Sequence, residues 1–279
     1  MSLHRDWRMA IQADSVVRKL PHVGTYRREL PVSLERLYEN AVDWEHLPYL
    51  HRSSFSKIDC DDAGEWGFRA RVWGQPFDQQ RSFVIELRLD PELRRWITRT
   101  VEGPGTGSEI WTHAFTLGDR KTLVVVDFFV PGVSQARAPE LGNFYTSLYA
   151  RLYDEDVSMM TERQTQLDAK SGTLRRDPLE LGRFHEIRRS LPLIVESAGR
   201  KFRIVEVAGQ LVAHSIVCPH RLGPLGDCKV EDATIECPWH GYRFDIRTRE
   251  CMKGARMSLA PAPRLQVESQ GARVILKWD

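Results

Sequence analysis

Two short segments in the last third of the sequence each pair a cysteine with a histidine. The first is Cys218-Pro-His220, and the second, Cys237-Pro-Trp-His240, begins seventeen residues after that histidine. Each segment offers one thiolate and one imidazole from a short loop, so together they can supply four ligands to one metal centre. Zinc accepts two cysteines and two histidines, and iron–sulfur clusters also take thiolate and imidazole ligands. The residue types alone leave both centres open.

A second set of candidate ligands comprises Asn40, Asp43, His46 and His51. Two neutral imidazoles and one carboxylate on one face of Fe(II) leave its other positions open for oxygen and water. On a straight helix, two histidines five residues apart would diverge by about 140°. We therefore predict that Pro48 ends the helix between them, so that both imidazoles can converge. The alternative is that both histidines are structural.

The third iron ligand is expected from a long helix, in which Asp154, Glu155 and Asp156 are consecutive. At 100° per residue, Asp156 points along the apolar stripe of this helix, whereas Glu155 lies at its flank and Asp154 on the opposite face. The stripe consists of Tyr145, Leu148, Tyr149, Leu152, Met159 and Met160. A carboxylate in an apolar stripe is costly unless it is paired or binds a metal. We predict Asp156 as the ligand, with an ion pair to Arg151 or Arg163 as the alternative.

The sequence around the cysteine–histidine pairs resembles Rieske proteins. The segments CPHRLGPL and CPWHGYRFD are similar to the two boxes in which histidines replace two cysteines on one iron of a [2Fe–2S] cluster. The resemblance implies that Cys218, His220, Cys237 and His240 hold such a cluster.

The two boxes differ from those of quinol-oxidising Rieske proteins. Those proteins carry a further cysteine in each box, at the positions occupied here by Gly223 and Trp239. They also have a serine that donates a hydrogen bond to a cluster sulfide. Because fewer hydrogen bonds to sulfur lower the reduction potential, we expect a value near the low end of the Rieske range, about −150 mV.

The N-terminal set resembles the mononuclear-iron motif of Rieske non-haem iron oxygenases, N-x-x-D-x-x-H-x-x-x-x-H. Asn40, Asp43, His46 and His51 occupy its four named positions. The resemblance implies that His46, His51 and Asp156 bind Fe(II) with Asn40 close by. It also implies that Asp43 couples a cluster histidine to an iron-binding histidine. In that family the Rieske domain comes first, whereas here the order is reversed.

The resemblance implies a terminal oxygenase that uses O2 and electrons from NAD(P)H to hydroxylate or oxidatively demethylate a small aromatic or alicyclic substrate. A separate flavin or iron–sulfur reductase is expected as partner, because the chain has no Gly-rich dinucleotide loop and no plant-type set of four cysteines. A homotrimer is expected from the head-to-tail rings of the family. Two alternatives stay open. One is an electron-transfer or redox-sensing protein with a metal-free, ligand-binding START-like domain, and the other is a zinc-stabilised binding module.

The elements that must position these residues indicate an α+β fold. Helical spacing of apolar residues over 31–47 is followed by runs with β character, GFRARVWG, RSFVIELRL, EIWTHAFTL and KTLVVVDFFVP, and helical spacing returns over 141–168. Short strands with turn signals follow residue 185. We predict a helix-grip START-like catalytic domain followed by a small all-β Rieske domain. The expected bounds are 1–172, a polar linker at 173–188, and 189–279.

Composition excludes several classes of function. The 279 residues carry 40 basic and 38 acidic side chains, a net charge of +2, so no strong field would recruit nucleic acid or an anionic membrane. No apolar run approaches the ~20 residues of a membrane span, and the N-terminus lacks a signal-peptide core, so we expect a cytoplasmic protein. The five scattered cysteines do not resemble a disulfide framework.

Overall fold

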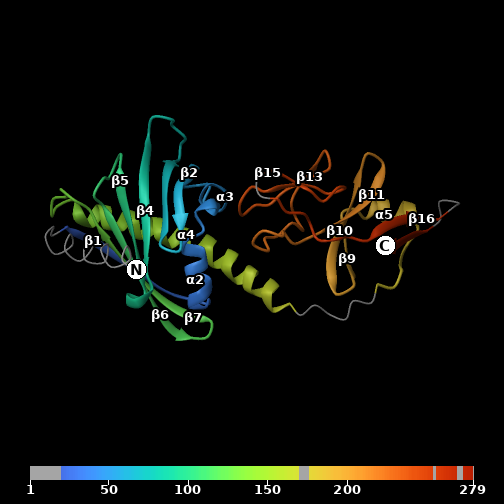
Figure 1. Cartoon of the computed structure of the whole chain (residues 1–279), viewed down its shortest axis with the longest axis horizontal. Helices are drawn as coiled ribbons and strands as arrows, with labels where there is room; N and C mark the ends of the chain where they lie inside the picture. Colours follow the sequence, from blue (N-terminus) through green and yellow to red (C-terminus); the bar gives the residue numbers. More distant parts are fainter. Residues whose placement is uncertain (1–19, 170–175, 254–255, 269–272, 279) are drawn as a thin grey trace. The chain divides into compact units, whose positions relative to one another are not determined.

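The chain forms two compact units, residues 1–160 and 161–279 (Figure 1). Helix α4 (Ala138–Asp168) runs across the boundary between them. None of the helices in the described ranges combines the length and apolar character that a membrane-crossing segment needs. The computed structural model describes residues 20–169, 176–253, 256–268 and 273–278.

The first unit is built on a seven-stranded antiparallel sheet in the order β1-β7-β6-β5-β4-β3-β2. Alternate residues of β7, from Thr122 to Phe128, are fully buried, as the period of a strand with one covered face requires. The strands are β1 (His22–Leu30), β2 (Phe55–Gly64), β3 (Gly67–Gly74), β4 (Ser82–Asp90), β5 (Arg95–Glu102), β6 (Glu109–Gly118) and β7 (Lys121–Phe129), and the 3-10 turn η2 (Pro91–Leu93) joins β4 to β5.

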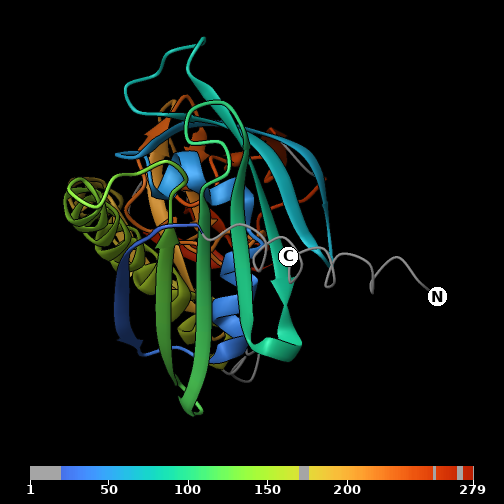
Figure 2. The ribbon, with the colours of Figure 1, turned by 90° about the vertical axis from the view of Figure 1, so that its left-hand side faces the viewer.

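Helix α4 packs its apolar face against this sheet, and Figure 2 shows α2 and α4 on the same side of the long strands. The Phe128 ring contacts Tyr145 and Tyr149 of α4, with ring centroids 5.1 and 5.0 Å apart. Gly142 lets the helix approach β1, because a Cβ there would lie 2.1 Å from the carbonyl oxygen of Val23. The sheet and α4 therefore pack in the predicted helix-grip arrangement.

The helical segment predicted at 31–47 is three helices. Helix α2 (Leu34–Ala41) ends before the histidines, the 3-10 helix η1 (Trp44–His46) follows, and α3 (Leu47–Leu50) comes last. Pro48 lies in the first turn of α3. Backbone N–H groups in the first turn of a helix have no acceptor within that helix, so a proline, which lacks the N–H, costs no hydrogen bond there. The prediction that Pro48 ends the first helix is wrong: α2 has already ended, and the proline begins a helix.

The second unit consists of three small antiparallel sheets, ordered β11-β10-β9, β12-β13-β14-β15 and β16-β17-β8, with one short helix, α5 (Phe184–Arg189). Its buried centre includes Phe202, Ile204 and Leu276. The strands are β8 (Leu179–Gly182), β9 (Leu193–Ser197), β10 (Arg200–Val207), β11 (Gln210–Ser215), β12 (Val230–Glu231), β13 (Thr234–Glu236), β14 (Arg243–Asp245), β15 (Cys251–Lys253), β16 (Arg264–Val267) and β17 (Val274–Lys277). The predicted class, an α+β helix-grip body followed by a small β unit, is confirmed.

Part of the predicted linker is folded into the second unit. Strand β8 pairs with β17, with Leu179 opposite Leu276 and Gly182 opposite Val274, and α5 follows it. Strand β8 lies at the edge of its sheet, and its first residues are exposed. An exposed edge strand can be as polar as a linker, so composition did not separate the two. Residues 173–175 of the expected linker lie outside the described residues.

Candidate metal centres and cavity

The two cysteine–histidine loops share one backbone geometry. In the first, Cys218 N–H donates to the carbonyl of Gly223 (2.8 Å), and Leu222 N–H donates back to the carbonyl of Cys218 (3.1 Å). In the second, Cys237 bonds Tyr242 (2.9 Å) and Gly241 (2.9 Å) through the corresponding atoms. The fourth residue after each cysteine has a left-handed backbone, with φ of 63° at Leu222 and 65° at Gly241.

The loops bring the four predicted cluster ligands together. Cys218 and Cys237 are buried, and the hydrogen bond between their thiols lowers the pKa of Cys218 and raises that of Cys237. The His220 and His240 rings lie 4.6 Å apart between centroids, at 85° to each other. Two thiols and two imidazoles gathered from facing loops fit a histidine-ligated [2Fe–2S] cluster. By contrast, Cys228 lies outside the two cysteine–histidine segments, and its thiol donates to the carbonyl of Pro224 (3.3 Å).

Gly223 is required where the loops meet. A Cβ at this position would lie 2.9 Å from Cys237 Sγ and 2.9 Å from the Trp239 ring. We expect Gly223→Ala to destabilise the second unit by about 1–3 kcal/mol and to lower cluster occupancy, measured by thermal unfolding and visible absorbance. Gly226→Ala is the control, because its Cβ would meet nothing closer than 3.7 Å. Equal effects of the two substitutions would contradict this steric role.

In the first unit, His46 from η1, His51 after α3 and Asp156 from α4 converge. The two Nε2 atoms are 3.2 Å apart, and Asp156 Oδ1 lies 3.5 Å from His46 Nε2 and 3.1 Å from His51 Nε2. All three residues are buried and can offer one ligand atom each to a common metal ion. Neighbouring ligands with metal bonds of about 2.1 Å lie about 3 Å apart at right angles. The spacing therefore fits two histidines and one carboxylate on one face of an ion.

Neighbouring side chains orient the three candidate ligands. Asn40 Nδ2 donates to Asp156 Oδ1 (3.1 Å), and His51 Nδ1 donates to Glu155 Oε2 (2.6 Å). Asp43 Oδ2 lies 4.0 Å from His46 Nδ1. Asn40 and Asp43 thus lie beside the three candidate ligands. The contact of Glu155 with His51 was not predicted from the sequence. The position of Glu155 on the flank of the apolar stripe of α4 fits this contact.

The buried charges in this set stabilise one another. Burial by itself raises the pKa of Asp156, but the hydrogen bond and charge of His51, with His46 and Asn40, lower it below the usual value. Burial lowers the pKa of His51, whereas Asp156 and Glu155 raise it, and the net direction is upward. Both directions favour the charged forms, a carboxylate at Asp156 and an imidazolium at His51, and a cation between the ligands would take over the neutralising role.

The helical periodicity of α4 correctly predicted which of its acidic side chains points inward and which points to solvent. Asp156 is buried, whereas Asp154 is exposed and forms an ion pair with Arg28 (2.5 Å). Within the described residues, the polar contacts of Asp156 include those with the Asn40 and histidine side chains given above.

On one continuous helix, Asp43 and His46 would lie opposite Leu34 and Leu37, on a face expected to be solvated. Both are buried, with 8% and 4% of their surfaces exposed. The reason is that α2 ends at Ala41, so the angular positions computed for a continuous helix do not apply beyond it.

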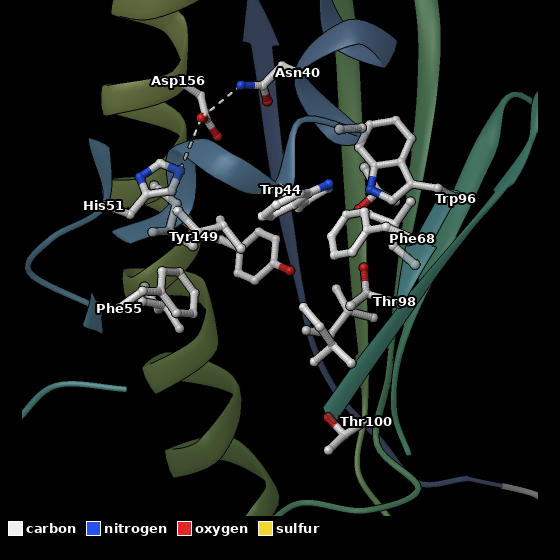
Figure 3. Close-up of a pocket in the computed structure, with 18 of the residues that line it drawn as sticks. Asn40, Trp44, His51, Phe55, Phe68, Trp96, Thr98, Thr100, Tyr149 and Asp156 are labelled. Carbon is white, nitrogen blue, oxygen red and sulfur yellow. Dashed lines mark hydrogen bonds and ion pairs between the residues drawn. The ribbon is translucent and has the colours of Figure 1, made fainter. Parts of the chain in front are cut away.

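A cavity of about 380 Å³ adjoins the three candidate ligands. Figure 3 shows His51, Asp156 and Asn40 at one side of it, and Thr98 and Thr100 away from them. Its volume lies in the range of sites for drug-sized ligands. The walls are mainly aromatic and aliphatic, formed by Trp44, Phe55, Phe68, Phe83, Ile85, Leu87, Trp96, Ile110, Tyr145, Leu148, Tyr149, Leu152 and Tyr153.

Comparisons with known proteins assign the second unit. Residues 178–263 match the family model of the Rieske [2Fe-2S] domain. The ferredoxin component of the naphthalene 1,2-dioxygenase system of Pseudomonas putida is 33% identical over 54 residues, 19% of this chain and 52% of that protein. The ferredoxin component of the naphthalene 1,2-dioxygenase/salicylate 5-hydroxylase systems of Ralstonia sp. is 33% identical over 58 residues, 21% of this chain and 56% of that protein. The chain spans about half the length of these curated relatives.

Solved structures are similar to parts of this chain at low identity. Zhui aromatase/cyclase from Streptomyces sp. R1128 is 15% identical, with 52% of this chain and 96% of that chain covered, at a TM-score of 0.41. The ferredoxin of carbazole 1,9a-dioxygenase from Nocardioides aromaticivorans IC177 is 22% identical, with 36% and 96% covered, at a TM-score of 0.31.

This chain therefore contains a Rieske domain at residues 178–263, after a helix-grip body. A Rieske domain implies a [2Fe–2S] cluster and a role in electron transfer. The assignment of individual ligands stays a prediction.

Proposed function

We propose that this chain is a Rieske non-haem iron oxygenase in which the usual domain order is reversed. Cys218, His220, Cys237 and His240 would hold the [2Fe–2S] cluster. The observation that carries the proposal is the convergence of two histidines and one carboxylate, at ligand-to-ligand spacing, on an aromatic cavity in a chain that also has a Rieske domain.

In this proposal, His46, His51 and Asp156 would hold Fe(II), which when bound supplies the site for O2 chemistry with electrons from the cluster. The chain's own residues would prepare that site. Asn40 donates to Asp156 Oδ1 and so directs the carboxylate, while Glu155 holds the tautomer of His51 that presents Nε2 to the ion. The aromatic walls would exclude water and place a ring-containing substrate, to be hydroxylated or oxidatively demethylated, next to the ligands.

The proposed role of Glu155 in orienting His51 can be tested directly. We expect Glu155→Ala to weaken iron binding by about 10- to 100-fold without changing the cluster spectrum, because His51 loses the acceptor that fixes its ring. Iron affinity is measured by titrating the apo first-unit site under anaerobic conditions. Glu162→Ala, about two turns further along α4, is the matched control. Unchanged iron affinity in Glu155→Ala would contradict the role.

Electron supply and assembly belong to the same proposal. The chain would receive electrons from NAD(P)H through a separate flavin or iron–sulfur reductase, and would act as a cytoplasmic homotrimer in which Asp43 couples the two centres. This part is supported by the resemblance of the N-terminal motif. Mixing a His240→Ala variant with a His46→Ala variant, and reassembling them, should restore part of the turnover if electrons cross between chains.

Metal content separates the proposed function from its alternatives. The purified protein should contain about three irons per chain, two in the cluster and one at the triad of His46, His51 and Asp156. It should also consume O2 with an aromatic substrate and a reductase. About two irons per chain, with no O2 consumption, would favour an electron-transfer or redox-sensing protein whose first unit binds a ligand without metal. A zinc-containing, iron-free protein would overturn both.

A further inference from the structure

Part of the cavity wall is formed by hydroxyl-bearing residues of two neighbouring strands. Thr98 of β5 lies opposite Ile110 of β6, and the next inward-facing residue, Thr100, donates its N–H to the carbonyl of Ser108 (3.0 Å). Thr98, Thr100 and Ser108 all line the cavity. Figure 3 shows Thr100 on the side away from Asp156 and His51, so these hydroxyls face a part of the ligand remote from the triad.

The side-chain hydroxyl of Ser108 is buried and lacks a hydrogen-bond partner within the described residues. The residue is 6% exposed, and its Oγ has no hydrogen-bond partner among the described residues. The hydroxyl of Thr112, further along the same wall, already bonds Tyr153. Since a buried hydroxyl without a partner is costly, a molecule in the cavity that bonds Ser108 would gain affinity there.

The charge of the lining restricts what Ser108 can bind. Among the described lining residues, the carboxylates and imidazoles are those of Asp43, His46, His51 and Asp156, which belong to the triad and its surroundings, and burial raises the pKa of the lining tyrosines. No lysine, arginine or carboxylate lines the wall around Ser108 in the described part of the chain. A charged group placed there would lose its hydration without gaining a counter-charge.

We propose that Ser108, with Thr98 and Thr100 beside it, binds an uncharged oxygen substituent of the substrate, a hydroxyl or a carbonyl. A serine hydroxyl can donate to a carbonyl or accept from a hydroxyl, so both groups fit. This contact orients the ligand, because it fixes the oxygen-bearing end away from the triad and leaves the unsubstituted ring towards it. The inference rests on the proposed function in taking this cavity as the substrate site.

Three ring compounds of similar size test the inference by equilibrium dialysis against the full-length protein: 2-naphthol, naphthalene and 2-naphthoate. We expect 2-naphthol to bind about tenfold more tightly than naphthalene and than the 2-naphthoate anion. Ser108→Ala should remove most of the preference for 2-naphthol over naphthalene. Ser54→Ala should keep it, because Ser54 has another unsatisfied buried hydroxyl but does not line the cavity.

Equal affinity for 2-naphthol and naphthalene would overturn the inference, as would a preference that survives in Ser108→Ala. Tightest binding of 2-naphthoate, or binding of none of the three, would also overturn it. Dialysis needs neither O2 nor reductant. Hence a protein that shows the expected preference but lacks the third iron would refute the proposed function and leave the binding assignment intact.

Discussion

Replacing Asp156 with alanine is expected to remove the mononuclear iron and abolish turnover, while the [2Fe–2S] spectrum stays unchanged. Asp156 supplies the single oxygen atom that lies within 3.5 Å of both histidine Nε2 atoms. Without it, two imidazoles face each other with no carboxylate among the three candidate ligands. The loss should exceed the ~100-fold that removing an outer hydrogen-bond partner costs in metal affinity. Iron analysis and O2 uptake measure the two effects.

Asp154→Ala is the matched control for this experiment. Asp154 lies two residues away on α4, but it is exposed and paired with Arg28, so its loss should cost no more than ~1 kcal/mol of stability and no iron. Asp156→Asn adds a test of charge, because the amide keeps the shape but removes the negative oxygen. A chain that keeps its third iron in Asp156→Ala, or loses it in Asp154→Ala, would refute the assignment.

The second large effect is expected from Cys237→Ala. Cys237 is buried, its thiol bonds that of Cys218, and its backbone closes the second loop onto Tyr242. Removing the thiolate should eliminate the visible absorbance and the EPR signal of a histidine-ligated cluster. Reductase-dependent turnover should vanish with them, because a chain without the cluster has no route for electrons to the iron.

Two other cysteines provide controls for the cluster. Cys228→Ala should retain the spectrum, because this thiol donates to the carbonyl of Pro224 (3.3 Å) and lies outside the two cysteine–histidine loops. Cys251→Ala should do the same, since Cys251 donates to the carbonyl of Lys253 (3.0 Å). A brown protein with intact EPR in Cys237→Ala would contradict the proposed ligand set.

The sequence by itself determined which residues are candidates for chemistry. Thiolates and imidazoles at the spacing of Cys218 to His240 have few uses other than metal binding, so their types indicated a metal site, and the sequence around them favoured a Rieske cluster over zinc. The selection of Asp156 over Asp154 also came from sequence, because α4 is a long regular helix and its 100° step holds over the whole apolar stripe.

Regular periodicity was misleading where the helix was short. The phase computed from Leu34 assumed that one helix continued to Pro48, but α2 ends at Ala41, so Asp43 and His46 are buried instead of solvated. Helix ends depend on hydrogen bonds of a few residues and on tertiary packing, which a periodic pattern does not record.

Only the tertiary structure decided which groups meet across the chain. The contact of Glu155 with His51 joins residues 104 positions apart, and the strand pairing of β8 with β17 joins the expected linker to the far end of the chain. Likewise, the unsatisfied hydroxyl of Ser108 became significant only because the sheet turns that residue towards a cavity. Ligand types and helix phase are local properties of the sequence, whereas the partners of buried polar groups depend on long-range packing.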